Sequence, residues 1–104
     1  MKQESDRERL QTVRQEIVDL LMAKEMNARD ISQEVSIREK DVYKHLDHIA
    51  RTAVTHGQKL VVRPSCCYDC GFVFSERSRL TRPGRCPQCK KSHIAPPVFT
   101  IGQR

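Results

Sequence analysis

The sequence lacks several features that would place it in common classes of protein. It has no tryptophan and only 5% aromatic residues, so its core must be largely aliphatic. No apolar stretch approaches the roughly 18 residues of a membrane span. The first ten residues, MKQESDRERL, contain no apolar run of the kind found in signal peptides. These absences predict a cytoplasmic protein with no membrane partner.

Recognisable catalytic motifs are also missing. The chain has no nucleophile beside a paired base, no Walker loop for phosphate and no HExxH sequence. Isolated helical histidines are usually surface or capping groups. The four histidines are scattered along the chain, as His45, His48, His56 and His93. We therefore expect that the protein is not an enzyme.

Positive charge is concentrated in the second half of the chain. The net charge of the 104 residues is +6, made up of −1 for residues 1–57 and +7 for residues 58–104. Such an asymmetry favours an acidic or polyanionic partner. The alternative is that these charges simply keep an exposed loop soluble.

The first half of the sequence predicts three helices. The first lies within residues 7–26, whose apolar residues repeat at spacings of three and four. Asn27 is the expected N-cap of a second helix over residues 28–35. Ser36 and Glu39 form a potential capping box for a third helix within residues 38–56, which Gly57 ends. The short break before the third helix favours a helix-turn-helix, although an ordinary three-helix bundle has similar corners.

All five cysteines lie close together in the second half. Cys67 and Cys70 form one C-x2-C pair, and Cys86 and Cys89 form another after fifteen intervening residues. Two thiolates from one tight turn can occupy two corners of a tetrahedron, and this spacing is typical of a four-cysteine zinc site. Four thiolates leave no open position for substrate, so we expect one structural Zn²⁺ per chain.

Two alternatives remain open at this site. Cys66 could replace Cys67 as the partner of Cys70 in a C-x3-C pair; otherwise Cys66 is a small buried side chain or an oxidisable surface thiol. Iron can also occupy a four-cysteine site, and a Cys-Pro-x-Cys sequence occurs in rubredoxins. A rubredoxin-like electron carrier is therefore a less favoured alternative function, which the colour of the purified protein would reveal.

Two predicted strands, at residues 58–64 and 96–101, enclose the cysteine segment. The predicted fold class is α+β: a three-helix winged helix-turn-helix with a four-cysteine zinc ribbon inserted between the two wing strands. The expected domains are residues 7–63 with 95–102 for the winged helix-turn-helix, and residues 64–94 for the ribbon.

The segments DVYKHLDHIAR, KLVVRPSCCYDCGFVF and RPGRCPQCKKSHIAPPVFTI carry a family resemblance. With them the chain resembles small prokaryotic predicted regulators that fuse a winged helix-turn-helix to a rubredoxin-like zinc ribbon. The resemblance implies a DNA-binding transcriptional regulator. The third helix is also similar to that of arsenical-repressor winged helices, but Glu39 and Asp41 stand where small hydroxyl residues are usual there.

Two groups of residues are candidates for contact with double-stranded DNA. On an ideal helix, Lys40, Lys44 and Arg51 lie about 160° to 200° from the inward-facing Val42, with Tyr43 beside them. Cations on such a face suit a major groove. The second group lies between the cysteine pairs and consists of Arg77, Arg79, Arg82 and Arg85. A protein-interaction module that uses the same basic face for an acidic partner is the alternative, and the first helix or the residues before Leu10 could pair two subunits as a homodimer.

Overall fold

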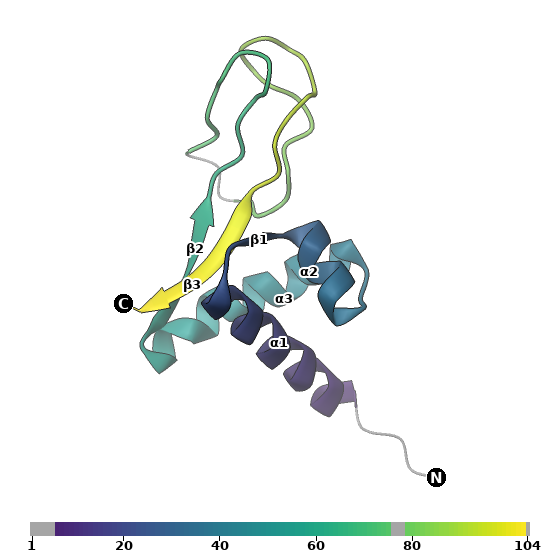
Figure 1. Ribbon diagram of the computed structural model, residues 1–104, viewed down its shortest axis with the longest axis vertical. Helices are drawn as coiled ribbons and strands as arrows, with labels where there is room; N and C mark the ends of the chain where they lie inside the picture. The colour runs from purple at the N-terminus through teal and green to yellow at the C-terminus, as the bar shows by residue number, and fades with distance from the viewer. Residues whose placement is uncertain (1–5, 76–78, 104) are drawn as a thin grey trace.

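A computed structural model of the protein describes residues 6–75 and 79–103, with side chains from residue 9 onward. The chain forms α1 (Asp6–Ala23), β1 (Met26–Asn27), α2 (Ala28–Val35) and α3 (Glu39–Thr52). The 3-10 turn η1 (Ala53–His56) and the strands β2 (Gln58–Arg63) and β3 (Val98–Gln103) follow. The helices and the sheet make one unit, from which the segment between β2 and β3 projects (Figure 1).

The limits of α2 follow from local chemistry. The Asn27 side chain accepts a hydrogen bond of 2.8 Å from the backbone N–H of Asp30, which confirms the predicted N-cap. The predicted capping box is wrong. Ser36 adopts a left-handed conformation with φ of 60° and ends α2 by donating its N–H to the carbonyl of Ser32, so Ser36 is not free to begin α3. Arg38 takes the N-cap position of α3 without a side-chain hydrogen bond.

The turn into the sheet matches the sequence expectation. Helix α3 tightens into η1, and Gly57 ends it with φ of 72°. At this angle a residue with a Cβ atom would be strained, whereas glycine is not. The chain then enters β2 without an intervening loop.

Three antiparallel strands form the sheet in the order β1-β3-β2. The two-residue strand β1 was not predicted, because so short a segment has no periodicity. In β2 and β3, Gln58 faces Gln103 and Arg63 faces Val98. The Thr100 hydroxyl also donates to the carbonyl of Leu21 at 3.0 Å, which ties the central strand to α1.

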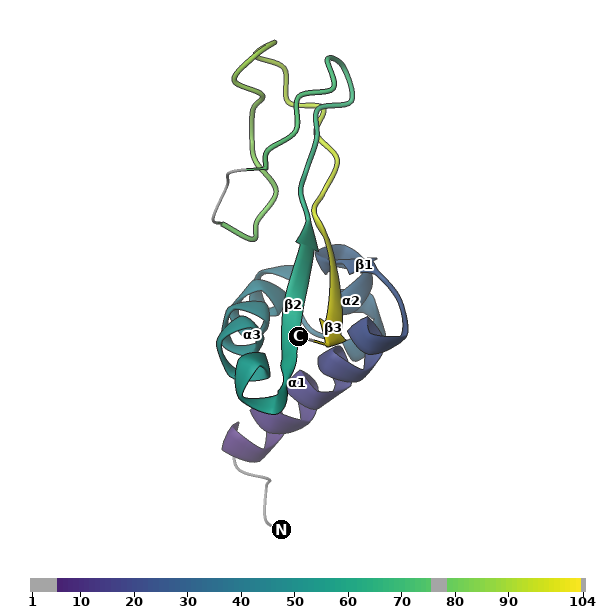
Figure 2. The same cartoon turned by 90° about the vertical axis from the view of Figure 1, so that its left-hand side faces the viewer.

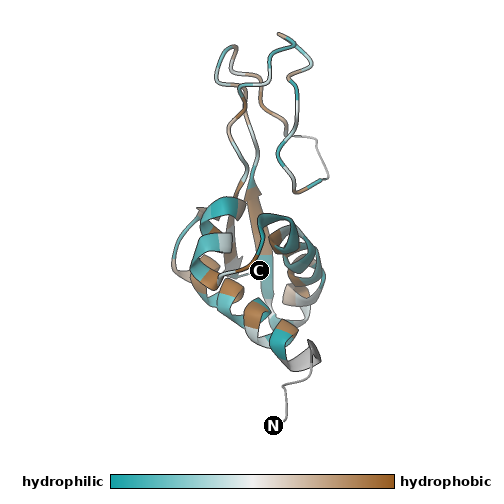
Figure 3. Cartoon of the chain, turned by 90° about the vertical axis from the view of Figure 1, so that its right-hand side faces the viewer, coloured by the Kyte–Doolittle hydropathy of each residue, from teal (hydrophilic) through white to brown (hydrophobic). Residues whose placement is uncertain are grey.

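The hydrophobic core lies between the three helices and the sheet. Phe99 is its largest fully buried side chain and extends from the central strand. Apolar positions recur along the helices with the spacing that the sequence predicts (Figure 3). An exception is Leu10, which is 41% exposed. The other core residues are Ile17, Leu21, Met26, Ala28, Ile31, Val42, Leu46, Ile49, Ala53 and Ile101.

The segment between β2 and β3 extends the molecule to 54 Å in its longest direction. The radius of gyration is 15.1 Å, against about 13 Å for a compact chain of this length. Both strands continue directly into this projection (Figure 2). Among the described residues, no helix is long and apolar enough to cross a membrane.

Candidate functional site

The first cysteine pair lies in a tight turn at the tip of the projection. The backbone N–H of Gly71 donates to the carbonyl of Cys67 at 2.9 Å, and the N–H of Cys67 donates to the carbonyl of Phe72 at 2.8 Å. Gly71 has φ of 82°, in the left-handed region that favours glycine. The turn therefore directs the thiols of Cys67 and Cys70 to the same side.

The second cysteine pair repeats this geometry. The N–H of Lys90 donates to the carbonyl of Cys86 at 2.9 Å, and the N–H of Cys86 donates to the carbonyl of Lys91 at 2.8 Å. Lys90, the residue that follows Cys89, corresponds to Gly71 and has φ of 69°. The same backbone conformation thus occurs in both turns, although only the first has the residue type that adopts it without strain.

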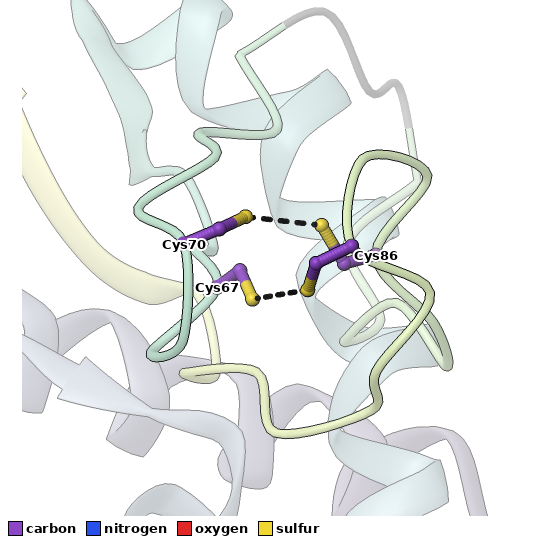
Figure 4. A group of neighbouring side chains, drawn as sticks. Cys67, Cys70 and Cys86 are labelled. Atoms are coloured by element: carbon purple, nitrogen blue, oxygen red, sulfur yellow. Dashed lines mark hydrogen bonds between the residues drawn. The ribbon is translucent and has the colours of Figure 1, made fainter.

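The four sulfur atoms of Cys67, Cys70, Cys86 and Cys89 lie within 4.8 Å of one another. The Cys67–Cys89 sulfur distance is 3.5 Å. The Cys70–Cys86 sulfur distance is 3.6 Å, and these two side chains point toward each other (Figure 4). A tetrahedral zinc centre with Zn–S bonds near 2.3 Å has sulfur atoms about 3.8 Å apart. The four cysteines are therefore positioned to bind one metal ion, consistent with Zn²⁺.

Backbone N–H groups stabilise thiolate at this site. Burial alone would raise the pKa of the Cys86 thiol, but hydrogen bonds from the N–H groups of Cys89 and Gln88 and from neighbouring thiols lower it to about 7. At Cys70, the Phe72 N–H acts in the lowering direction, yet burial and the other three thiols together raise the pKa to about 12. Without a cation, the four thiols cannot all ionise near neutral pH because their negative charges repel. A bound divalent ion removes that restriction.

Little apolar surface is buried around the metal site. Ile94 is only 3% exposed and pairs with Cys67 across an isolated bridge, as expected for a packing partner. Phe72 and Phe74 are half-buried and pack edge to face, with ring centroids 5.0 Å apart. Tyr68, by contrast, is 59% exposed and does not belong to this small core.

The thiol of Cys66 is half-buried and does not belong to the four-sulfur cluster. Its backbone carbonyl accepts a hydrogen bond of 2.8 Å from the N–H of Ala95, and the residue forms a bridge with Val73. Cys67, rather than Cys66, is therefore the partner of Cys70 at the metal site.

The three predicted cations of the third helix are exposed on α3. Lys40, Lys44 and Arg51 are all accessible, and the Lys44 side chain is 75% exposed. The Lys44 ammonium lies 4.0 Å from a carboxylate oxygen of Asp41, which also pairs with Arg38 at 3.2 Å. Pairs this exposed are weak and leave the cations available to another ligand.

The segment between the two cysteine pairs that contains Arg79, Arg82 and Arg85 is called the basic loop here. Tyr43 lies where α3 meets this basic loop. Its hydroxyl donates to Glu39 at 3.3 Å. Burial and the Glu39 carboxylate raise the pKa of the Tyr43 phenol, whereas the charge of Arg82 acts in the lowering direction. Leu80, in the same loop as Arg82, packs against the core of the helical unit. The loop thus folds back from the ribbon toward α3 (Figure 2).

The predicted arginines of this loop are accessible where the structure describes them. Arg79, Arg82 and Arg85 are exposed. Arg77 lies outside the described residues. Arg79 also lines a pocket of about 150 Å³ with Val62 at the base of the ribbon. This return of the loop was not predicted from the sequence, although Leu80 is the one apolar residue in an otherwise polar, basic stretch.

A buried interaction between α1 and α3 was not predicted from the sequence. His45 is only 6% exposed, and its Nδ1 accepts a hydrogen bond of 3.2 Å from Nε of Arg14. Burial, followed by the nearby charge of Arg14, lowers the pKa of His45. The helical periodicity places His45 next to the buried Leu46, but a pair separated by 31 residues cannot be read from local spacing.

Comparisons with known proteins divide the chain into two parts. Residues 12–61 match the family model described as PF0610-like, N-terminal. Residues 64–104 match the PF0610 rubredoxin-like zinc beta-ribbon domain, which includes all four metal-site cysteines. No curated protein matches the sequence.

A solved structure resembles the whole chain. It is the solution NMR structure of protein PF0610 from Pyrococcus furiosus, with 26% sequence identity and a TM-score of 0.78. The similarity covers 100% of this chain and 97% of that protein. The helical unit and the ribbon therefore occur together in both molecules.

Proposed function

Because the chain combines a PF0610-like N-terminal domain with a PF0610 rubredoxin-like zinc β-ribbon, we propose that both parts form one DNA-binding surface of a transcriptional regulator. In this proposal the helical unit is a winged helix-turn-helix of residues 7–63 and 95–102. Helix α3 is its recognition helix, and β2 and β3 are the wing strands. Residues 64–94 are the ribbon that extends the wing.

The observation that carries the proposal is the return of the basic loop to α3. Arg82 is close enough to act electrostatically on Tyr43 of α3, and Leu80 packs on the helical core. The two groups of cations that the sequence suggested separately are thereby brought to adjoining surfaces. A polyanion that contacts α3 near Tyr43 can reach the loop arginines without a rearrangement of the domains.

The metal has a structural role in this proposal. Four cysteine ligands complete the coordination of zinc and leave no open site for a substrate, so the metal has no catalytic role in this proposal. By holding the two cysteine turns together, the metal sets the positions of the two ends of the basic loop, at Cys70 and Cys86. Loss of zinc would release the loop from its place beside α3.

Charge on α3 also supports a second candidate function. Glu39, Asp41 and Asp47 balance the three cations of α3, so the helix itself has no net charge. A protein partner with a mixed or acidic surface could dock on such a helix, whereas nonspecific DNA binding requires an excess of cations. The same basic loop would then contact an acidic patch on that partner.

The test is the salt dependence of binding to a short duplex. We expect the zinc-loaded protein to bind a fluorescent duplex, with log affinity falling linearly against log salt by about 0.9 for each neutralised phosphate. The double variant Arg79→Gln, Arg82→Gln should reduce that slope by roughly 1.8. The control variant Arg9→Gln, Lys59→Gln removes the same charge from α1 and from the start of β2, away from the loop, and should leave the slope nearly unchanged.

Two results would contradict the proposal. No binding to any duplex at low salt would exclude the DNA-binding function and favour the protein-interaction module. Equal losses of slope in the two double variants would show that binding follows net charge rather than the surface formed by α3 and the loop. Lys44→Ala separates the contacts further, because loss of a base contact costs about 1–3 kcal/mol at one base pair only.

A further inference from the structure

A groove between α1 and the C-terminal half of α3 has the composition of a ligand site. It has a volume of about 730 Å³ and lies among residues 11–22 of α1 and 48–58 of α3, η1 and β2. Its apolar side is formed by Val18, Met22, Ile49 and Ala53. Pockets for small molecules commonly occupy about 300–1,000 Å³ and combine an apolar lining with a few polar groups.

Among the residues whose side chains the structure describes, the ionisable ones that line the groove are all basic. They are Arg14, His48 and His56. Asp19 accepts a hydrogen bond of 3.0 Å from Gln15, which lines the groove, but Asp19 itself is not part of the lining. An anion in the groove would therefore meet positive charge without displacing a carboxylate.

Arg14 is held in place for such a contact. Its Nε donates to the buried Nδ1 of His45, which fixes the plane of the guanidinium group. Among the described residues, the terminal nitrogens of Arg14 have no carboxylate partner. A guanidinium group presents these donors in a geometry that matches a carboxylate.

Positive charge surrounds His48. Burial, followed by the charges of Arg14 and Arg51, lowers the pKa of His48. An anion beside His48 would act in the opposite direction and raise that pKa, because it favours the imidazolium form. The amides of Gln11, Gln15 and Gln58 and the hydroxyl of Thr52 supply further polar groups around the groove.

We propose that this groove binds a small amphipathic organic anion, an aromatic or branched aliphatic carboxylate. Its carboxylate would contact Arg14 and the two histidines, and its apolar part would cover Val18 and Met22. The groove is separate from the four-cysteine centre and from the loop arginines of the proposed DNA surface. The inference therefore does not require that the protein binds DNA.

Benzoate and its uncharged isostere benzamide are suitable probes. In ¹H–¹⁵N NMR spectra of the zinc-loaded full chain, benzoate should cause saturable shifts at Arg14, His48 and His56. The expected dissociation constant is on the order of 1 mM. Benzamide should bind at least about tenfold more weakly, since it lacks the charge that the groove recognises. Benzoate should also raise the NMR-measured pKa of His48.

Variants locate the site. Arg14→Gln should weaken benzoate binding, but it also removes the partner of the buried His45. His56 is exposed, so His56→Gln provides a second variant that leaves the core untouched. It should weaken benzoate binding about threefold or more. Arg29→Gln removes an exposed cation from α2, outside the groove, and should leave the dissociation constant unchanged.

Several outcomes would overturn the proposal. These are equal binding of benzamide and benzoate, shifts centred on Arg79 and Arg82 instead of the groove, and an absence of saturable shifts up to about 20 mM benzoate. Shifts at Arg14 and His48 with duplex DNA but not with benzoate would assign these residues to phosphate contacts instead.

Discussion

Replacing Gly71 with alanine should weaken zinc binding through the backbone alone. Gly71 has φ of 82°, and a Cβ atom built at this position has no neighbour within 4 Å. The cost is therefore conformational strain without a steric clash. The left-handed conformation costs a residue with a Cβ atom about 1–2 kcal/mol, and the stiffer unfolded chain of an alanine variant offsets about 0.4–1 kcal/mol of that cost.

The net cost is roughly 0.5–1 kcal/mol, which corresponds to a two- to fivefold weaker zinc affinity. The effect appears in the affinity because the ribbon buries little apolar surface and folds around its metal. A competition titration against a chromophoric chelator at constant pH would measure it. We expect the helical content, followed by circular dichroism, to remain unchanged.

Two other glycines provide controls for this measurement. Gly84 lies within the ribbon and likewise has open space around a built Cβ atom, but its φ is not in the left-handed region. Gly84→Ala should therefore leave zinc affinity unchanged or slightly improved. Gly57→Ala, with φ of 72° at the end of η1, should lower the thermal stability of the helical unit and leave zinc affinity unchanged. If Gly71→Ala and Gly84→Ala have the same zinc affinity, the strain argument is refuted.

Three further predictions concern the metal ligands, the buried histidine and the α2 cap. Cys86→Ser should abolish stoichiometric zinc binding, while Cys66→Ser should retain it, as measured by metal analysis after dialysis; retention by both variants would exclude the assigned ligand set. The pKa of His45 is lowered in the folded protein, so as pH falls the His45 imidazole takes up a proton in the unfolded chain before it does so in the folded one. The free energy of unfolding should therefore be highest above the unfolded pKa, near 6.5, and should decrease below it. Denaturant titrations of the wild type and of His45→Gln from pH 7.5 to 5 test this, with a smaller pH dependence expected in the variant. Asn27→Ala should lower the free energy of unfolding by about 1 kcal/mol, and an unchanged denaturation midpoint would contradict the capping role.

Sequence patterns predicted the features that depend on nearby residues. The C-x2-C spacing is sufficient to predict the metal centre, because each turn is formed within six residues. Asn27 marks the start of α2 through the hydrogen bond that its side chain accepts. Gly57 marks the end of η1 because glycine adopts a positive φ without strain. Ser36 shows the limit of such reasoning. It has the residue type of an N-cap, but its backbone is already used to end α2.

Features that depend on distant residues could not be predicted in this way. The two residues of β1 form a strand only because β3, more than 70 residues later, supplies their partners. The contact of Leu80 with the helical core likewise depends on how the ribbon folds back. The hydrogen bond between Arg14 and His45 requires that α1 and α3 pack side by side. These contacts also define the proposed functional surfaces, so the site was less predictable than the fold elements around it.

The pairing of Arg63 with Val98 has a consequence for how such proteins diverge. Paired residues of antiparallel strands lie roughly 5 Å apart, so the ribbon leaves and rejoins the sheet at nearly the same point. A two-residue hairpin turn could bridge that gap. In evolutionary terms, the ribbon is a cassette at the tip of a hairpin. One insertion, deletion or exchange in a gene could add, remove or replace it without shifting the register of β2 and β3. Only the contacts that the ribbon loop makes with the helical unit, through Leu80 and Arg82, would have to change with it.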